Sequence, residues 1–584
     1  MIDFLYSTIR YRKPRLFSDD KPIEKFIGVD TEAFTDGKPF IICTSLKKSY
    51  CPSELPDFFF DPIYKGASFV VYNMKYDSGA LIYTLTDEQK RTLWEYNKCQ
   101  SGIYTYEYIP HKFLSIKRGK KEKVEFWDIA QFYDMSLDKA AKKYLGEGKL
   151  DVGTKSFTSQ YLENNRKKII DYCIRDAELT ARLAHYFKDK LETFGVECSR
   201  PYSEASLSFA YFKARCKIQT VWRFWTDYND LIKMACESYQ GGKFEITSRG
   251  SVEAYEYDIV SAYPFEMAGL FDIRLSKVTR DKKYNPDAVY SFLRCWIKNS
   301  EGKHSPHAVK IDGVQQYPNG EYFMTLTKAE YEYMIKNGFD ITILDAMHLE
   351  TNKRTHPYDK TIRELFEIKN KLKNGDETLY AISKKMINGI YGKMVQCIEQ
   401  PDGTRKAGPG WNPIYGAIIT ANTRLRATAF QERFGDDCIG VHTDSVLLKK
   451  PLDDTELSES LGGVKFEGKE KAVLIACGIY DFGEKCKYRG FEFKQDFTWK
   501  QLLLEHYNRS EIYYPQKRVI SWTEAIAQNR PEKINVFEDY NKKIDLNCDV
   551  KRLWLKKARA RDLLHGLEMS LPKIVVQGRD DCPY

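Results

Sequence analysis

Two acidic residues, Asp30 and Glu32, follow a run of apolar residues that begins at Phe26 and is typical of a buried strand. Side chains at positions i and i+2 of a strand point to the same face, so we expect the two carboxylates to lie side by side. Carboxylate oxygens are the ligands that Mg²⁺ and other hard cations prefer in proteins. Acidic pairs at strand ends are also common as solvated groups, so the pair alone leaves both interpretations open.

Two more acids follow a polar residue at helical spacing. Asp77 comes four residues after Asn73, where an apolar strand at 68–72 gives way to a helix. Asp176 comes four residues after Tyr172 in a long helical stretch. Each pair therefore lies on one helical face. Cleavage of a phosphodiester by two metal ions needs carboxylates that hold cations about 4 Å apart and a polar group that orients the attacking water. The four acids and Tyr172 predict this chemistry.

A second group of residues further along the chain has the side chains needed for nucleotide transfer. Asp258 ends a strand, and Pro264 favours the start of a helix directly after it. Lys384, Asn388 and Tyr391 are spaced i, i+4 and i+7, which aligns a cation, an amide and a ring along one helical face. Such a face can contact a triphosphate, a sugar and a base pair. Two local alternatives stay open: a capping role for Asp258, and an amphipathic core helix around Lys384.

A polar turn at Asp444 completes the second group. The turn joins two apolar segments within residues 438–448, a pattern that predicts a hairpin with Asp444 at its tip. If this tip faces Asp258, the two carboxylates form a second two-metal site, suited to in-line displacement at an α-phosphate. The three segments together are far more specific than any one of them.

Several domains must position these two groups. The chain has 584 residues, whereas single hydrophobic cores rarely grow past about 250 to 300 residues. Strand and helix patterns alternate up to the helix predicted at 159–194, which indicates an α/β domain ending near residue 195. Short strands are predicted between about 270 and 360, and a helical hairpin at 358–394 with its turn at Asn374-Gly375.

Composition excludes several classes of protein. The 14 cysteines include no Cys-x-x-Cys pair and have no histidine at zinc-ligand spacing, so we expect reduced thiols. No apolar run approaches the roughly 18 residues of a membrane span, and four cations interrupt residues 1–17, unlike a signal peptide. A cytoplasmic protein is expected. Six cations with Trp554 among them at 551–561 predict a helix that tracks phosphates, with a solvated helix face as the alternative.

The first group resembles a known set of motifs. Asp-x-Glu, Asn-x-x-x-Asp and Tyr-x-x-x-Asp occur here in the same order as the three motifs of the DnaQ-like 3′→5′ exonucleases. The resemblance implies that Tyr172 orients the attacking water, that Asn73 and Tyr76 hold a single-stranded 3′ end, and that Lys149 assists catalysis. It implies the following metal ligands: Asp30, Glu32, Asp77 and Asp176.

The second group resembles the polymerase motifs of family B. Residues 258–264 match Asp-x-x-Ser-x-Tyr-Pro, residues 384–392 match Lys-x-x-x-Asn-x-x-Tyr-Gly, and residues 442–445 match Asp-Thr-Asp-Ser with His442 in place of the first acid. The resemblance implies that metal is bound by Asp258, Asp444 and the Ile259 carbonyl, and that Tyr263 packs against the deoxyribose and excludes a 2′-hydroxyl. The remaining nucleotide contacts it implies are Lys384 on the triphosphate with Lys369 or Lys373, and Asn388 and Tyr391 along the nascent pair.

Two further segments extend the likeness to residues 26–492. Tyr239-Gln240-Gly241-Gly242 resembles a segment that contacts the template and balances synthesis against proofreading, and Lys487 begins a motif resembling one that grips the primer backbone. The chain thus resembles the protein-primed family B DNA polymerases, of the phi29 type. This family implies two Mg²⁺ ions per active site, with Mn²⁺ able to substitute. The implied partners are a DNA template and primer, dNTPs, a terminal protein and a single-stranded-DNA-binding protein.

The family also implies an α/β and α+β multidomain fold, an RNase H-like exonuclease domain followed by a right-hand polymerase. The expected divisions are exonuclease 1–195, palm 196–270 and 426–533, an insertion for the priming protein and template 271–360, fingers 361–395, a second insertion 396–425 and thumb 534–584. His442 suggests one alternative, a DNA-binding subunit of a replication complex with an inactive polymerase site. A second alternative is an exonuclease alone.

Overall fold

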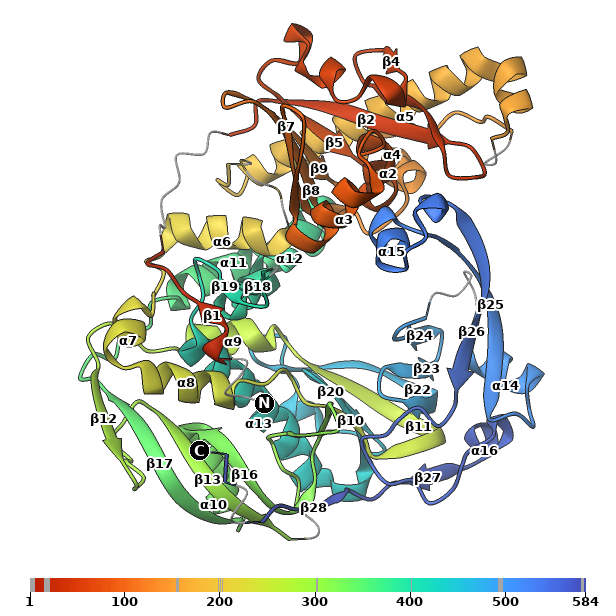
Figure 1. Cartoon of the computed structure of the whole chain (residues 1–584). Helices are drawn as coiled ribbons and strands as arrows, with labels where there is room; N and C mark the ends of the chain where they lie inside the picture. The colour runs from red at the N-terminus through yellow and green to blue at the C-terminus, as the bar shows by residue number, and fades with distance from the viewer. Residues whose placement is uncertain are drawn as a thin grey trace.

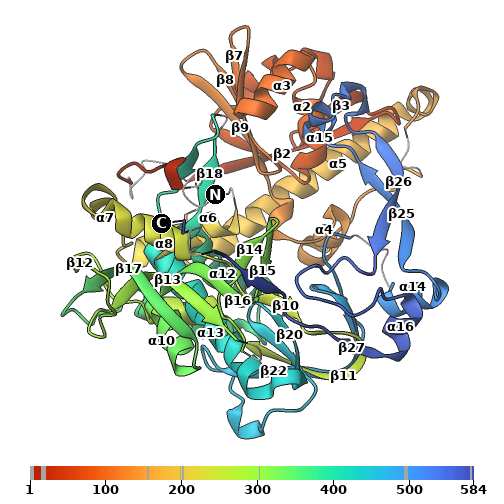
Figure 2. The same cartoon turned by 60° about the horizontal axis from the view of Figure 1, so that its bottom comes forward.

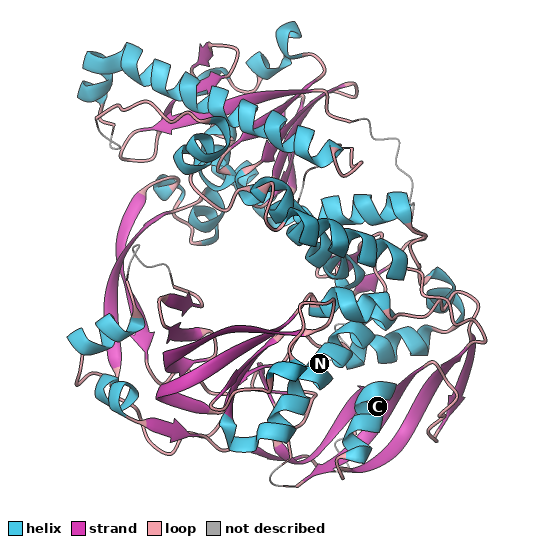
Figure 3. Cartoon of the chain, turned by 180° about the vertical axis from the view of Figure 1, so that it is seen from behind, coloured by secondary structure: helices cyan, strands magenta, loops and turns pink. Residues whose placement is uncertain are grey.

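The computed structural model describes residues 6–14, 22–153, 157–197, 199, 201, 203–300, 303–400, 402–491, 497–578 and 582–583. An N-terminal α/β domain lies at the top of Figure 1, and below it lie an eight-stranded sheet, a five-stranded sheet, smaller sheets and helices. Seen from behind, helices run from the N-terminal domain towards the centre of the molecule (Figure 3). Within the described ranges, none of the helices is both long enough and apolar enough to cross a bilayer.

The N-terminal domain is built on an eight-stranded sheet with the order β4-β3-β2-β5-β9-β8-β7-β6. Strands β2, β5 and β9 run parallel, and the long helix α5 packs along β2. The predicted strands and the long helix are confirmed. The strands are β2 Lys25–Ala33, β3 Pro39–Thr44, β4 Lys48–Tyr50, β5 Ala67–Val71, β6 Lys98–Ser101, β7 Tyr104–Ile109, β8 Phe113–Arg118 and β9 Glu122–Asp128. The helices are α2 Met74–Leu81, α3 Asp87–Tyr96, α4 Leu137–Leu145 and α5 Ser159–Glu192, with short 3₁₀ turns η1 Pro52–Glu54, η2 Asp57–Phe60, η3 Pro62–Tyr64 and η4 Ala130–Phe132.

A second eight-stranded sheet lies at the centre of the part of the chain that follows the N-terminal domain. Its order is β10-β20-β21-β11-β22-β23-β24, with β27 beside β11, and all of its pairs are antiparallel. Its strands are β10 Phe244–Ile246, β11 Ser248–Ile259, β20 Cys438–His442, β21 Ser445–Leu448, β22 Val464–Ala476, β23 Ile479–Phe482, β24 Lys485–Tyr488 and β27 Leu567–Met569. Around it lie α6 Glu204–Arg215, α7 Trp222–Asp227, α8 Asn229–Ser238, α9 Ala262–Ala268, α13 Pro413–Phe434, η5 Gly435–Asp437 and η6 Asp454–Glu456.

The predicted strand-rich segment supplies four strands of a five-stranded sheet with the order β12-β17-β13-β16-β28. Its edge strand β28 comes from near the C-terminus and runs parallel to β16. The segment therefore does not complete its sheet alone. The elements are β12 Lys277–Asp281, β13 Tyr290–Asn299, β14 Val309–Ile311, β15 Val314–Gln316, β16 Asn319–Thr327, α10 Lys328–Lys336, β17 Asp340–Glu350 and β28 Ile574–Val576.

The predicted helical hairpin is confirmed as α11 Asp359–Leu372 and α12 Glu377–Val395. A short hairpin follows, β18 Cys397–Glu399 and β19 Arg405–Ala407, and β19 pairs with β1 Ile9–Arg10. Helix α13 then begins at Pro413, so the boundary expected at residue 425 falls inside a helix. Thr420, Thr423 and Arg424 in this part of α13 are buried.

The C-terminal part is a long two-stranded hairpin, β25 Glu511–Val519 and β26 Phe537–Asp545, with α15 Trp522–Ala527 and η7 Pro531–Lys533 at its tip. Helices α14 Trp499–Glu505 and α16 Ala560–His565 pack at its base. The helix predicted over 551–561 is wrong, since only the residues from Ala560 onward are helical. Arg552 is buried, and its guanidinium donates to the Glu245 carboxylate at 2.7 Å. The Lys551 ammonium donates to the Phe244 carbonyl. These contacts hold the segment against the central sheet.

Candidate active sites

Three of the predicted acids meet in the N-terminal domain. Asp30 and Glu32 project from β2, and Asp176 projects from α5, which packs on that strand. One carboxylate oxygen from each lies within 4.8 Å of the others. Asp77 approaches from the first turn of α2, where the Thr31 hydroxyl donates to its Oδ1 at 2.8 Å. The fold therefore gathers the four acids that the sequence singled out.

The electrostatics of this cluster fit a divalent cation. Burial raises the pKa of Glu32 to about 8 and that of Asp77 to about 7, and burial with the charge of Asp176 raises the pKa of Asp30. Asp30 Oδ2 and Asp176 Oδ1 are buried with no hydrogen-bond partner among the described residues. Buried anions without partners are costly, and a bound cation would supply the missing charge.

The neighbouring polar residues lie where the sequence placed them. The Lys149 ammonium pairs with Asp176 and lies 4.7 Å from the centroid of the Tyr172 ring. Burial alone would lower the pKa of Lys149, but the charges of Asp176 and Asp30 outweigh it and raise this pKa, so the amine stays charged. Asn73 is the exposed N-cap residue of α2, and Tyr76 is half-buried in its first turn.

The second site forms where β11 and β21 pair. Asp258 lies opposite Ser445 in this ladder, and the Ile259 amide donates to the Asp444 carbonyl at 2.8 Å. Asp258, Asp444 and Lys384 line one cavity of about 710 Å³. Burial and the charge of Asp444 raise the pKa of Asp258 to about 7, and burial raises that of Asp444. This donor set, two crowded carboxylates at an open cavity, also suits divalent cations.

The structure of helix α12 fits both interpretations of its sequence, a polar face that can contact a nucleotide and an amphipathic core helix. Lys384 and Asn388 are exposed, whereas Met386, Ile387 and Ile390 are buried. From α11, the Lys369 ammonium contacts the Ser261 hydroxyl at 3.2 Å, and burial with the charge of Lys384 lowers its pKa to about 8.

Lys373 is placed differently from Lys369. Its ammonium pairs with Glu459 at 2.8 Å, whereas that of Lys369 contacts Ser261, three residues after Asp258, and neither lysine is among the residues that line the cavity. Of the two lysines offered by α11, the geometry therefore favours Lys369 as the companion of Lys384.

The Tyr-x-Gly-Gly segment lies against Tyr263 and Thr443. The rings of Tyr263 and Tyr391 are stacked, and a side chain at Gly242 would lie within 2.9 Å of the Tyr263 hydroxyl. Tyr239, the first residue of this segment, is the C-cap of helix α8 and is half-buried. Gly242 must therefore stay without a side chain for the loop to touch Tyr263.

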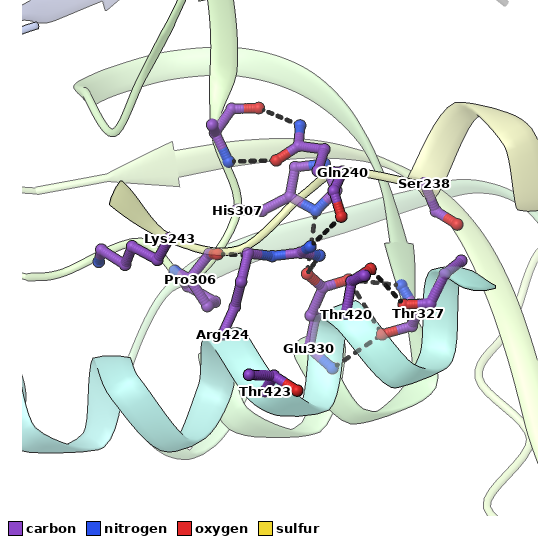
Figure 4. A network of polar contacts seen from close by, with 12 residues as sticks. Ser238, Gln240, Lys243, Pro306, His307, Thr327, Glu330, Thr420, Thr423 and Arg424 are labelled. Atoms are coloured by element: carbon purple, nitrogen blue, oxygen red, sulfur yellow. Dashed lines mark hydrogen bonds and ion pairs between the residues drawn. The ribbon is translucent and has the colours of Figure 1, made fainter. Parts of the chain in front are cut away.

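A buried arginine that the sequence did not single out holds this loop. Arg424 of α13 donates to the carbonyl oxygens of Gln240 and Gly241 at 2.8 and 2.9 Å, and to Glu330 of α10 at 2.6 Å (Figure 4). Glu330 also meets the His307 ring at 3.0 Å. These partners lie between 94 and 184 residues from Arg424. No local pattern could have revealed it.

His442 is a packing residue of the second cavity. Its ring stacks on Tyr480 with centroids 5.0 Å apart and planes 10° from parallel. Neither ring nitrogen has a hydrogen-bond partner within the part of the chain that the structure describes. Burial lowers the pKa of His442 to about 4, so the imidazole is neutral near pH 7. Lys487 lines the same cavity.

Comparison with known proteins finds DNA polymerases. Residues 153–402 match the family model described as DNA polymerase type B, organellar and viral. A DNA polymerase of Acidianus bottle-shaped virus (isolate Italy/Pozzuoli) is 24% identical over 455 residues, which cover 70% of this chain and 67% of the relative. A probable DNA polymerase of Neurospora intermedia is 22% identical over 318 residues, which cover 50% of this chain but only 32% of the relative.

The solved structures give the fold. Phi29 DNA polymerase complexed with primer-template DNA and incoming nucleotide matches with a TM-score of 0.62 at 15% identity, over 89% of this chain and 99% of that one. The same polymerase with single-stranded DNA matches with a TM-score of 0.61. The chain therefore has the fold of phi29 DNA polymerase, and its residues 153–402 match the type B polymerase model. The expected multidomain fold, an exonuclease domain followed by a right-hand polymerase, is confirmed.

Further charged residues of this chain line the second cavity without having been predicted. Glu256 and Glu467 face Asp258 closely enough for their charges to raise its pKa further. Lys485, Lys487 and Arg489 line the same cavity. The two lysines belong to the edge strand β24 of the central sheet, and Arg489 follows it directly. The spacing of Glu256 and Asp258 in β11 was a signal for Glu256, since side chains at i and i+2 of a strand share a face.

Proposed function

We propose that this polymerase extends a DNA primer at Asp258 and Asp444 and proofreads the product by 3′→5′ hydrolysis at Asp30, Glu32, Asp77 and Asp176. The observation that carries the proposal is the presence of two separate clusters of crowded, half-buried or buried carboxylates, each beside a lysine. Two such clusters match the two chemistries of a proofreading polymerase, and neither shares a side chain with the other.

At the polymerase site, the chain's own residues bind and orient the nucleotide. Lys384 and Lys369 offset the charge of the triphosphate, while Tyr263 packs against its sugar and Tyr391 and Asn388 border the new base pair. Asp258, Asp444 and the Ile259 carbonyl would hold two Mg²⁺ ions, for which Mn²⁺ can substitute, and these ions stabilise charge on the attacking and leaving oxygens. The Tyr-x-Gly-Gly loop and Lys487 keep template and primer in register.

At the exonuclease site, the frayed 3′ end is held by Tyr76 and Asn73, since an aromatic ring accepts any base. The four acids would hold a pair of divalent cations that activate water and stabilise the leaving oxygen. Tyr172 orients the water through its hydroxyl. Lys149, kept charged by Asp176, offsets negative charge that builds on the phosphate.

We further propose the partners and domain roles. The priming terminal protein and the template contact the insertion at 271–360, with 361–395 as fingers and 396–425 as a second insertion. The exonuclease spans 1–195, the palm 196–270 and 426–533, and the thumb 534–584. The protein works in the host cytoplasm with a single-stranded-DNA-binding protein. The family likeness supports these assignments.

Primer extension tests the proposal directly. With dNTPs and Mg²⁺, the protein should extend a paired primer on a template, and without dNTPs it should degrade a single-stranded 3′ end. Degradation without extension would favour an exonuclease alone. The absence of both would favour a DNA-binding subunit with an inactive polymerase site. Nucleotide transfer onto a candidate terminal protein tests protein priming separately.

A further inference from the structure

The tip of the C-terminal hairpin, residues 520–536, is docked on the N-terminal domain. Trp522 and Ile526 of α15 are fully buried in the same hydrophobic cluster as Phe69 and Tyr108 of the N-terminal sheet. The rings of Trp522 and Tyr108 have centroids 5.0 Å apart. In Figures 1 and 2, α15 lies beside the N-terminal domain, and it contacts both α2 and α3. The hairpin tip therefore completes the core of the exonuclease domain.

The two surfaces fit closely at two glycines of the N-terminal domain. A Cβ at Gly37, which has a φ of +83°, would overlap the carbonyl oxygen of Ile534. A Cβ at Gly79 of α2 would lie 2.8 Å from the side-chain nitrogen of Asn535. At both places the backbone touches the hairpin tip without an intervening side chain. The tip thus has one defined position against α2.

Asn535 reaches the exonuclease site directly. Its side-chain Nδ2 donates to the backbone carbonyl of Tyr76 at 3.0 Å, and the residue is only 2% exposed. Tyr76 immediately precedes Asp77 in the first turn of α2. On the other side of this turn, Thr31 donates to the Asp77 carboxylate at 2.8 Å. The turn is therefore held between β2 and the hairpin tip.

We propose that Asn535 is a positioning residue of the exonuclease site, through which the C-terminal hairpin sets the place of Tyr76 and Asp77. The inference rests on the proposed exonuclease function. Hydrolysis with two metal ions needs the acids and the 3′ end to lie within about 0.5 Å of their productive positions. If β2 alone held this turn, Tyr76, which holds the single strand, and the carboxylate of Asp77 would both shift. Hydrolysis of the 3′ end therefore requires a docked hairpin tip.

A matched pair of variants tests this. Asn529 and Asn535 both lie in the hairpin tip with left-handed backbones, φ 56° and 62°, and both bond to the N-terminal domain. Asn529 accepts from Arg91 of α3 at 2.7 Å, away from α2. Asn529→Gly and Asn535→Gly each remove one amide while suiting the backbone. Only Asn535→Gly removes the bond to the Tyr76 carbonyl, so Asn529→Gly serves as the control for docking in general.

Hydrolysis of a single-stranded 3′ end should fall about tenfold in Asn535→Gly, the effect of one lost buried hydrogen bond, and stay near wild type in Asn529→Gly. Extension of a paired primer should stay within about twofold in both. Asn535→Asp, which places an acceptor against the Tyr76 carbonyl, should lose at least as much hydrolysis. Equal losses in Asn529→Gly, or a matching loss of extension, would overturn the assignment, because docking or folding as a whole would then set the rate.

Binding of a fluorescent single-stranded oligodeoxynucleotide in EDTA gives a readout that needs no metal and no turnover. Asn535→Gly should weaken this binding, since Tyr76 holds the strand, and Asn529→Gly should not. Unchanged binding and unchanged hydrolysis in Asn535→Gly would refute the inference while leaving the exonuclease proposal intact. A wild-type protein that extends primers but degrades no single strand would instead remove the exonuclease proposal itself.

Discussion

The rings of Tyr263 and Tyr391 are stacked, with their centroids 4.3 Å apart and their planes 7° from parallel. One ring comes from α9, beside Asp258, and the other from α12, which carries Lys384. The stack therefore joins the part of the site that carries Asp258 to the part that carries Lys384. With Gly242 against its hydroxyl, Tyr263 has little freedom to move aside for a larger sugar.

Replacing Tyr263 by valine should increase ribonucleotide incorporation by about tenfold or more, because the space beside the sugar would then admit a 2′-hydroxyl. The measurement is the ratio of kcat/KM for a ribonucleotide and the matching deoxyribonucleotide. A changed affinity for dNTPs with an unchanged ratio would leave Tyr263 as a packing residue only.

The double variant Asp30→Ala with Glu32→Ala should abolish degradation of a single-stranded 3′ end and leave extension of a paired primer nearly intact. Each missing ligand removes charge from the exonuclease cluster, and the two sites share no side chain. Time courses of both reactions on labelled oligonucleotides check this. Persistent degradation would mean that the hydrolytic site lies elsewhere.

Extension should be lost in Asp444→Asn and retained in His442→Ala. Asp444 is one of two carboxylates at the second site, whereas the neutral ring of His442 packs on Tyr480 without a hydrogen-bond partner in the described ranges. His442→Phe, which preserves the packing, separates a loss of stability from a loss of chemistry. If His442→Ala and His442→Phe are as inactive as Asp444→Asn, the imidazole takes part in the reaction.

Arg424→Lys should raise the KM for dNTPs about tenfold with a smaller effect on hydrolysis of single strands. Lysine can keep the pair with Glu330, but it cannot reproduce the fork that also reaches the Gln240 and Gly241 carbonyls. Arg433→Lys, an exposed arginine on the same helix, is the control. Steady-state kinetics would contradict the role of Arg424 if kcat fell while the KM stayed constant.

Stability should depend on His304 in mild acid. Burial, aided by the charge of Lys243, lowers the pKa of His304 from 6.5 to about 4. Between these two values the folded protein binds fewer protons than the unfolded chain, so stability falls as the pH drops through this window. His304→Gln should make the fall shallower. Urea midpoints measured above pH 6.5 and near pH 4 check this, and identical slopes for both proteins would contradict it.

Local spacing in the sequence predicted the elements that carry the acids, because strand and helix periodicities depend on neighbours only. Asp176 on a long helix and Asp444 at a hairpin tip are of this kind. Contacts made by tertiary packing leave no such pattern. Arg552 was expected on a solvent-facing helix, yet its partner Glu245 lies 307 residues away, and Asn535 bonds to Tyr76 across 459 residues.

The burial of Trp522 and Ile526 in the N-terminal core has a consequence for the order in which the protein matures on the ribosome. The exonuclease sheet is synthesised first, but two of the side chains that fill its core are translated more than three hundred residues later. At about 5 to 20 residues per second, the nascent domain waits for tens of seconds with part of its apolar surface uncovered. The N-terminal domain therefore completes its folding only after the C-terminal hairpin has been synthesised.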